Sequence, residues 1–274
     1  MSKNIIVKVG KNNIANNFPF TLIAGPCVIE SKQHSFDMAG KINDICSLLK
    51  INFVYKSSFD KANRTSINSP RGIGLSKSLS IFSEIKKKIK CSVTTDVHET
   101  GQCSKISKVV DLLQIPAFLC RQTDLLVAAA KTKKPVNIKK GQFLSPSEIT
   151  NVIKKIKNNN KILLTERGFS FGYNNLISDM RSLAIMKKTG LPIFFDATHS
   201  VQQPGGLLKS SGGQREFVSV LAKAAVSVGI AGILIETHNN PDNAPSDGPC
   251  MLPLKELQVL LEKLIELDFV TKNN

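Results

Sequence analysis

Hydrophobic positions along the chain fall into short apolar runs that alternate with stretches of helical periodicity. Eight runs predict buried strands, at residues 20–25, 53–57, 92–96, 112–116, 135–139, 162–166, 192–196 and 233–236. Most are followed by apolar side chains three or four residues apart, as in Met38, Ile42, Ile45 and Leu49. Nearly continuous apolar strands that alternate with helices indicate a parallel sheet covered on its outer face. Eight such units predict a (β/α)8 TIM barrel.

An open doubly wound sheet is the alternative fold. It predicts a glycine-rich phosphate loop directly after the first strand. The first strand ends instead in Gly25-Pro26-Cys27, which favours the barrel. We expect the whole chain, residues 1–274, to form a single barrel domain, with residues 1–19 as an N-terminal extension. Residues 5–14 predict a β-hairpin around Gly10 that closes the bottom of the barrel.

The composition is that of a globular protein, with 42% hydrophobic and 21% charged residues. No apolar run approaches the roughly 18 residues of a membrane span. The first residues lack the apolar region and cleavage site of a secretory signal. We therefore expect a cytoplasmic protein that does not associate with membranes. Its six cysteines form no close pair of the kind found in zinc ribbons, and they should stay reduced.

The net charge is +16, from 37 Lys and Arg against 21 Asp and Glu. Such an excess suits either a nucleic-acid-binding protein or an enzyme that gathers anionic substrates. A general enrichment of lysine would also explain it. The chain has no Trp and only two Tyr, so it lacks the aromatic and basic strip on which bases stack. We expect no nucleic-acid partner.

Polar side chains gather at the predicted strand ends, which form the active face of a barrel. Seven of the eight ends carry a group that ionises or binds metal, and half-buried groups of this kind are costly without partners. This clustering predicts an enzyme. Six cations predict a site for phosphates or carboxylates: Lys56, Lys61, Arg64, Arg121, Lys139 and Arg167. Two long segments, 57–74 and 200–215, are expected to form loops over the opening at these strand ends, which we call the mouth.

A second group consists of Cys27, His199, Glu236 and Asp247, which follow neighbouring strands of a closed barrel. A thiolate, an imidazole and two carboxylates suit Zn²⁺, Fe²⁺ or Mn²⁺ better than Mg²⁺. The spacing is not a compact motif, so the residues alone favour a buried thiol at position 27 and a hydrogen-bonded histidine at position 199. His98 and His238 are alternative ligands.

Eight segments together resemble the family of 3-deoxy-D-manno-octulosonate 8-phosphate synthases (KDO-8-phosphate synthases). They are residues 24–31 (AGPCVIES), 55–66 (YKSSFDKANRTS), 113–124 (LQIPAFLCRQTD), 137–143 (NIKKGQF), 165–168 (TERG), 171–176 (FGYNNL), 196–200 (DATHS) and 246–249 (SDGP). The resemblance runs from about residue 20 to residue 254. Departures are mild, with Tyr55 where Phe is common and Thr65 where Ser is common, and neither position is a charged contact.

The resemblance implies condensation of phosphoenolpyruvate with D-arabinose 5-phosphate and water, for synthesis of the lipopolysaccharide core. It also implies a (β/α)8 barrel that assembles as a homotetramer. The phosphoenolpyruvate contacts it implies are Lys56, Lys61, Gln114, Lys139, Arg167 and the backbone of Pro116 and Ala117. The implied contacts of the pentose phosphate are Asn63, Arg64 and Ser66.

The family has one branch with Asn at the position of Cys27, which works without metal, and another with Cys, which needs a divalent ion. Cys27 therefore implies the metal-dependent branch, with His199, Glu236 and Asp247 as the other ligands. Lys61, His199 and Asp247 are the candidate catalytic residues. The rival enzyme is 3-deoxy-D-arabino-heptulosonate 7-phosphate synthase, which uses erythrose 4-phosphate. It would show Lys-Pro-Arg-Thr where this chain reads KANRTS at 61–66.

Overall fold

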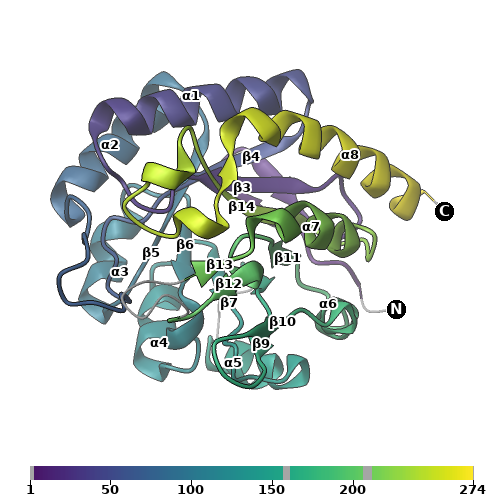
Figure 1. Cartoon of the computed structure of the whole chain (residues 1–274). Coiled ribbons are helices and arrows are strands. Elements are labelled where there is room, and N and C mark those ends of the chain that lie inside the picture. The colour runs from purple at the N-terminus through teal and green to yellow at the C-terminus, as the bar shows by residue number, and fades with distance from the viewer. Residues whose placement is uncertain (1–2, 157–160, 206–211, 274) are drawn as a thin grey trace.

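The protein folds into a closed barrel of eight parallel strands (Figure 1), as a computed structural model shows for residues 3–156, 161–205 and 212–273. The strands, in order around the barrel, are β3 (Thr21–Gly25), β4 (Asn52–Lys56), β5 (Ser92–Asp96), β6 (Leu112–Ile115), β7 (Val136–Lys139), β8 (Ile162–Glu166), β11 (Ile193–Asp196) and β14 (Gly232–His238). Strand β14 pairs with both β3 and β11, which closes the ring. Each strand end lies within two residues of the predicted boundary, so the predicted barrel is confirmed.

Helices surround the barrel in the order in which they occur in the chain (Figure 1). They are α1 (Lys32–Leu48), α2 (Leu75–Lys88), α3 (Thr100–Ser107), α4 (Thr123–Lys131), α5 (Ile149–Lys155), α6 (Met180–Lys187), α7 (Val218–Val226) and α8 (Leu254–Lys272). Their apolar stripes face the strands. Met38 and Ile42 of α1, for example, are fully buried in the main core. Helix α1 begins where it does because the Ser31 side chain accepts the backbone N–H of His34.

The predicted hairpin closes the amino-terminal end of the barrel. Strands β1 (Val7–Val9) and β2 (Asn12–Ile14) pair antiparallel across a turn at Gly10, whose φ is +57°. A side chain at Gly10 would meet Ser92 Oγ at 2.3 Å, so both φ and space require glycine. The three inward side chains of the hairpin pack against those of the barrel strands, which confirms the predicted plug.

The remaining elements are short and lie in the connections: β9 (Phe169–Ser170), β10 (Leu176–Ile177), β12 (Gln202–Gln203), β13 (Gly212–Gly213), β15 (Leu252–Pro253) and the 3-10 helices η1 (Ala117–Leu119), η2 (Pro146–Glu148), η3 (His199–Val201), η4 (Arg215–Phe217), η5 (Pro241–Asn243) and η6 (Gly248–Cys250). Residues 57–74 contain no helix or strand, and all of them are described. The predicted loop 200–215 begins in η3 and β12, and its residues 206–211 lie outside the described part of the chain.

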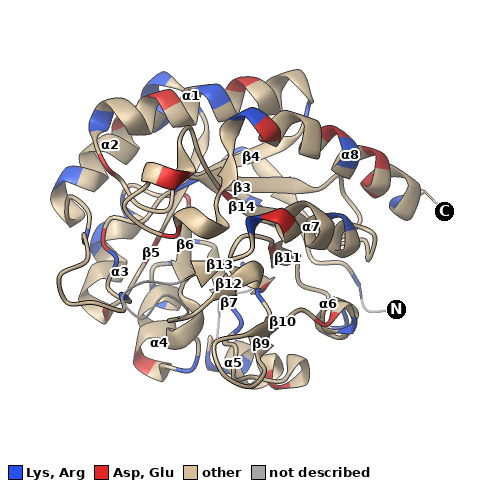
Figure 2. Ribbon diagram, in the orientation of Figure 1, with Lys and Arg blue, Asp and Glu red and all other residues tan. Residues whose placement is uncertain are grey.

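The excess of basic residues is distributed over the outer helices. In Figure 2, Lys and Arg lie on α1, α2 and α3 among acidic residues rather than in one continuous strip. All six cysteines are free and buried, as expected of small apolar side chains. None of the described helices is long and apolar enough to cross a bilayer.

Candidate active site

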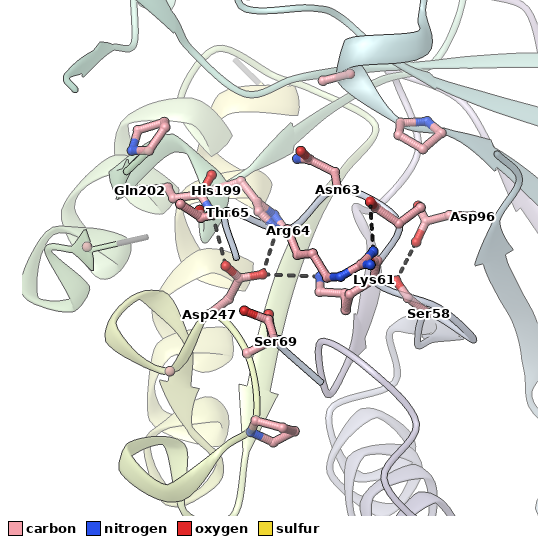
Figure 3. Close-up of a pocket in the computed structure, with 18 of the residues that line it drawn as sticks. Ser58, Lys61, Asn63, Arg64, Thr65, Ser69, Asp96, His199, Gln202 and Asp247 are labelled. Atoms are coloured by element: carbon pink, nitrogen blue, oxygen red, sulfur yellow. Dashed lines mark hydrogen bonds and ion pairs between the residues drawn. The ribbon is translucent and has the colours of Figure 1, made fainter. Parts of the chain in front are cut away.

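A cavity of about 1210 Å³ opens at the carboxyl ends of the barrel strands (Figure 3). Ten predicted site residues line it: Lys56, Lys61, Asn63, Arg64, Pro116, Ala117, Lys139, Arg167, His199 and Asp247. The parallel register explains why residues so far apart in sequence meet here, because each strand delivers its last residue to the same end. The volume exceeds the usual range for one small-molecule ligand, so two small anions have room.

Three lysines of the mouth are paired with carboxylates, of which two are buried and that of Asp247 is half-buried. Lys56 Nζ lies 2.6 Å from Glu236 Oε1, and Lys139 Nζ lies 2.6 Å from Asp196 Oδ2. Lys61 Nζ lies 3.1 Å from Asp247 Oδ2. Burial, the largest single influence, would raise the pKa of Glu236, but Lys56 and the other positive groups around it together outweigh burial, so the net shift is downward. These carboxylates are therefore ionised at neutral pH.

Two arginines of the mouth have no salt bridge to a carboxylate in the described chain. Arg167 donates to the His199 carbonyl at 2.9 Å and to Gln202 Oε1 at 3.0 Å, and its buried Nε has no hydrogen-bond partner. Arg64 reaches only the carbonyls of Lys61 and Ala62, each at 3.4 Å. Burial lowers the pKa of Arg167 from its usual value. Because unsatisfied buried guanidinium groups are costly, both arginines are suited to bind anions that enter the cavity.

A possible metal centre lies on the floor of the cavity. One ligand atom each of Cys27, Glu236 and Asp247 lie within 4.8 Å of one another. Cys27 Sγ donates to Asp247 Oδ2 at 2.9 Å, and Glu236 Oε2 is buried without a hydrogen-bond partner. Burial, then the charges of Asp247 and Glu236, raise the pKa of the Cys27 thiol well above its usual value. The unsatisfied oxygen and the anionic surroundings fit a divalent cation at this point.

His199 faces the same point from η3. Its Nε2 lies 3.7 Å from Glu236 Oε2 and 3.9 Å from Asp247 Oδ2. Its Nδ1 lies 2.8 Å from Asp196 Oδ2, and an ionised carboxylate only accepts hydrogen bonds, so the Nδ1 carries the proton. In the neutral ring, the lone pair of Nε2 is then available to a metal ion, in the carboxylate–histidine arrangement typical of metal sites. Asp196 had no predicted role, although its position three residues before His199 at a strand end was a usable signal.

Four predicted site residues, besides Arg121, are not among those that line the cavity. Gln114 lies beneath it, where its Nε2 donates to Asp96 at 2.5 Å and its Oε1 accepts from Asn137 at 3.0 Å. Its contact with phosphoenolpyruvate stays a prediction. Glu236 and Cys27 are buried beneath the floor, in contact with Lys56 and Asp247, which do line the cavity. Ser66 is half-buried in the loop, and its hydroxyl accepts the N–H of Asn68 at 3.3 Å.

Arg121 was expected among the mouth cations and does not line the cavity. It is exposed after η1, and its carbonyl accepts a hydrogen bond from Lys155 of α5 in the outer layer. The short helix η1 carries the chain from the strand end to the outside, which a linear pattern does not reveal. The lining residues without an assigned role include Ser58, which donates to Asp96, and Gln202, whose Nε2 lies 3.0 Å from Asp247 Oδ1 (Figure 3).

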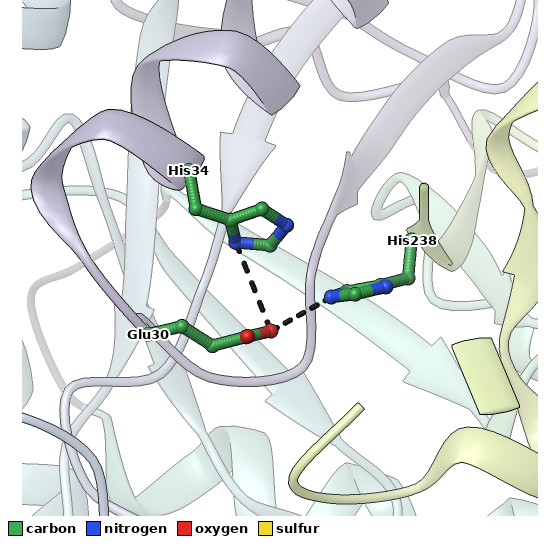
Figure 4. A group of neighbouring side chains, drawn as sticks. All are labelled: Glu30, His34 and His238. Carbon is green, nitrogen blue, oxygen red and sulfur yellow. Dashed lines mark hydrogen bonds and ion pairs between the residues drawn. The ribbon is translucent and has the colours of Figure 1, made fainter. Parts of the chain in front are cut away.

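Glu30, His34 and His238 form a second cluster, between the start of α1 and the end of β14 (Figure 4). His238 Nδ1 accepts the backbone N–H of Asn240 at 2.9 Å, so Nε2 carries a proton and donates it to Glu30 Oε1 at 2.7 Å. The ring thus offers a proton, not a lone pair, to the centre of the cluster. We therefore assign these residues to hydrogen bonding between the two segments, and His238 is not a substitute ligand in this arrangement.

The fold and the mouth define a (β/α)8 barrel with an anion-binding cavity and a group of metal-type ligands at its carboxyl-terminal face. The chain belongs to the DAHP synthetase I family, whose sequence profile matches residues 4–273. It is similar to proteins named 2-dehydro-3-deoxyphosphooctonate aldolase. It is 62% identical to the one from Bartonella quintana (strain Toulouse) over 271 residues, which cover 98% of each chain. It is 59% identical to the one from Brucella anthropi over 98% of each chain, and 57% identical to the one from Brucella ovis over 99% of each.

Proposed function

We propose that the chain condenses phosphoenolpyruvate with D-arabinose 5-phosphate and water to give 3-deoxy-D-manno-octulosonate 8-phosphate and phosphate. The observation that carries the proposal is one cavity that combines two arginines without carboxylate partners, Arg64 and Arg167, with the cluster of Cys27, Glu236 and Asp247. The two arginines suit two phosphorylated substrates, and the three-residue cluster suits a divalent ion. The names of the similar proteins support the eight-carbon product.

The two substrates are assigned to different sides of the mouth. Lys139 and Arg167, at the ends of β7 and β8, are proposed to hold phosphoenolpyruvate, with the backbone at Pro116 near its phosphate. Arg64 and Asn63, from the loop after β4, are proposed to hold the phosphate of the pentose. Both groups line the same cavity, which supports binding of the two substrates within reach of each other.

The reaction joins C3 of phosphoenolpyruvate to the aldehyde carbon C1 of the open-chain pentose. As this bond forms, C2 gains positive character and water adds to it. The resulting hemiketal phosphate then releases phosphate by cleavage of its C2–O bond, leaving a ketone at C2. Fixed cations hold the two anions in line, which supplies positioning without reorganisation at the moment of reaction. Lys61, His199 and Asp247 are the proposed groups for proton transfer, because their side chains meet beside the cavity floor.

The proposed ligands of a divalent ion are Cys27, His199, Glu236 and Asp247, with Zn²⁺, Fe²⁺ or Mn²⁺ as the candidates. When bound, such an ion would polarise the aldehyde or a water molecule. Three contacts of the chain would favour binding of the ion. Asp196 orients His199, and Lys56 and Lys61 favour the ionised forms of Glu236 and Asp247. Each contact leaves a charged atom or a lone pair directed at the proposed ion site.

The seven-carbon alternative, with erythrose 4-phosphate as the acceptor, is not favoured. The segment 61–66 lacks the Lys-Pro-Arg-Thr expected of that enzyme. The relatives named above match this chain over nearly its whole length, and their names specify the octonate. We also propose a homotetramer. Phe118 lines the cavity and is nevertheless 47% exposed, so a neighbouring subunit has an apolar surface to cover there.

The test is phosphate release from phosphoenolpyruvate by the purified chain. Arabinose 5-phosphate and erythrose 4-phosphate are compared as acceptors at equal concentration, each with and without a metal chelator. We expect release with the pentose phosphate, little with the tetrose phosphate, and loss of both on chelation. Preference for erythrose 4-phosphate would favour the rival enzyme, and release without any acceptor would indicate a simple phosphatase.

A further inference from the structure

A lysine and a glutamate are buried directly behind the two cations assigned to phosphoenolpyruvate. Lys140 follows Lys139 at the end of β7, and Glu166 precedes Arg167 at the end of β8. The Lys140 side chain has no exposed surface, and that of Glu166 is 2% exposed. Lysine and glutamate are almost never buried this fully unless they are paired. Here Lys140 Nζ lies 3.5 Å from Glu166 Oε2.

Each member of the pair also holds the turn that carries a mouth cation. Lys140 Nζ donates to the carbonyls of Gly141 at 3.1 Å and Leu144 at 3.0 Å, which fixes the turn after Lys139. Glu166 Oε1 accepts the backbone N–H groups of Arg167 at 2.9 Å and Gly168 at 2.7 Å. The pair therefore joins two adjacent strand ends through their backbones, just outside the cavity.

Stability alone does not explain this arrangement. A well-packed apolar pair in place of a buried ion pair is often as stable or more stable, because the charges lose their hydration. A shift of the pair would instead move two particular side chains. Lys139 and Arg167 are the neighbours of Lys140 and Glu166 in sequence, and both line the cavity. A displacement of about 1 Å at such a position can lower a rate by about 100-fold.

We propose that Lys140 and Glu166 are positioning residues that set the spacing of Lys139 and Arg167 for the carboxylate and phosphate of one substrate. They touch neither the cavity nor the ligand cluster, and they act through the backbone of the two turns. The choice of phosphoenolpyruvate as that substrate rests on the function proposed above.

The chain contains a matched control at the opposite end of the barrel. Lys272 Nζ lies 2.6 Å from Asp268 and donates to the carbonyls of Phe18 at 2.6 Å and Ile230 at 2.8 Å. It is thus also a lysine with one carboxylate and two carbonyl partners, with its side chain only 10% exposed, but it is remote from the mouth. Lys140→Met and Lys272→Met remove the same chemistry from the two sites.

The experiment measures the dissociation constant of phosphoenolpyruvate by calorimetry and the KM of both substrates, for the wild-type chain and the two variants. We expect Lys140→Met to weaken phosphoenolpyruvate binding and raise its KM by about tenfold or more, with the KM of the pentose phosphate within about twofold of wild type. Lys272→Met should lower thermal stability and leave both KM values unchanged. If Lys140→Met does not fold, the neutral double variant Lys140→Met/Glu166→Gln is judged by the same criterion.

Unchanged phosphoenolpyruvate binding in a folded Lys140→Met protein would overturn the proposal. So would equal changes in the two KM values, or the same selective change in Lys272→Met. A wild-type chain that binds phosphoenolpyruvate without turnover would refute the proposed reaction, and the binding comparison would still decide the role of the pair. Failure of the wild-type chain to bind phosphoenolpyruvate would overturn both.

Discussion

Replacement of Arg64 by alanine tests the assignment of the pentose phosphate end. The guanidinium contacts only two backbone carbonyls, both at 3.4 Å, and it makes no salt bridge in the described chain. Its removal should therefore cost little folding free energy. A hydrogen bond from a charged donor contributes about 1.5–3 kcal/mol. The loss corresponds to a decrease of about 10- to 150-fold in kcat/KM for the pentose phosphate.

The assay is initial-rate phosphate release at saturating phosphoenolpyruvate with varied arabinose 5-phosphate, repeated with arabinose, which lacks the phosphate. Arg64→Ala should lose most of its preference for the phosphorylated sugar and behave like wild type with arabinose. Arg71→Ala is the matched control, because Arg71 lies in the same loop but is already engaged by Asp60 at 2.9 and 2.6 Å. An unchanged KM for arabinose 5-phosphate in Arg64→Ala would refute the assignment.

Three further predictions address the metal ligands, the strand ends and the buried charges. Chelation should abolish turnover, and Mn²⁺, Fe²⁺ or Zn²⁺ should restore it in the wild type but not in Cys27→Ala; full activity of a preparation shown by atomic absorption to be metal-free would contradict the role of Cys27. Gly25→Ala should destabilise the fold by about 1–3 kcal/mol in urea unfolding, because the new Cβ would lie 2.0 Å from the Lys56 carbonyl oxygen; an unchanged midpoint would show that the strands separate easily. Burial would raise the pKa of Asp96, but Lys56 and other positive groups hold it well below the usual value. The stabilisation is thus present above about pH 4 and is lost as pH falls toward the folded-state pKa, so Asp96→Asn should flatten the acid limb of a stability–pH curve.

The barrel was predictable because its strands are buried on both faces. Such strands appear as continuous apolar runs, and the eight runs lie within two residues of the observed strands. Closure of the ring then brings Cys27, after the first barrel strand, next to Glu236 on the last one. Residues at opposite ends of the chain become neighbours by topology alone, so the proximity of Cys27 and Glu236 followed once the number of strands was known, whereas their role as metal ligands was implied only by the family resemblance.

Contacts that depend on side-chain direction were not predictable. The buried chain from Asp96 through Gln114 and Asn137 to Thr165 crosses four strands, and its hydrogen bonds exist only because of their mutual register. Strand periodicity gives no register between partners. The pairing of Lys140 with Glu166 is hidden for the same reason, because the two residues are far apart in sequence and meet only in space. Arg121 was wrongly expected at the mouth. It follows a strand end in sequence, but the short helix η1 carries the chain away from the mouth before Arg121 is reached.

The most direct test of the central claim is the identity of the product. The metal-loaded chain is incubated with arabinose 5-phosphate and phosphoenolpyruvate labelled with ¹⁸O in the C2–O–P bridge, and both products are analysed by mass spectrometry. The account predicts an eight-carbon phosphorylated keto acid without the label, and inorganic phosphate that carries it, because the C2–O bond breaks. Pyruvate as the carbon product, or label retained in the sugar acid, would contradict the account.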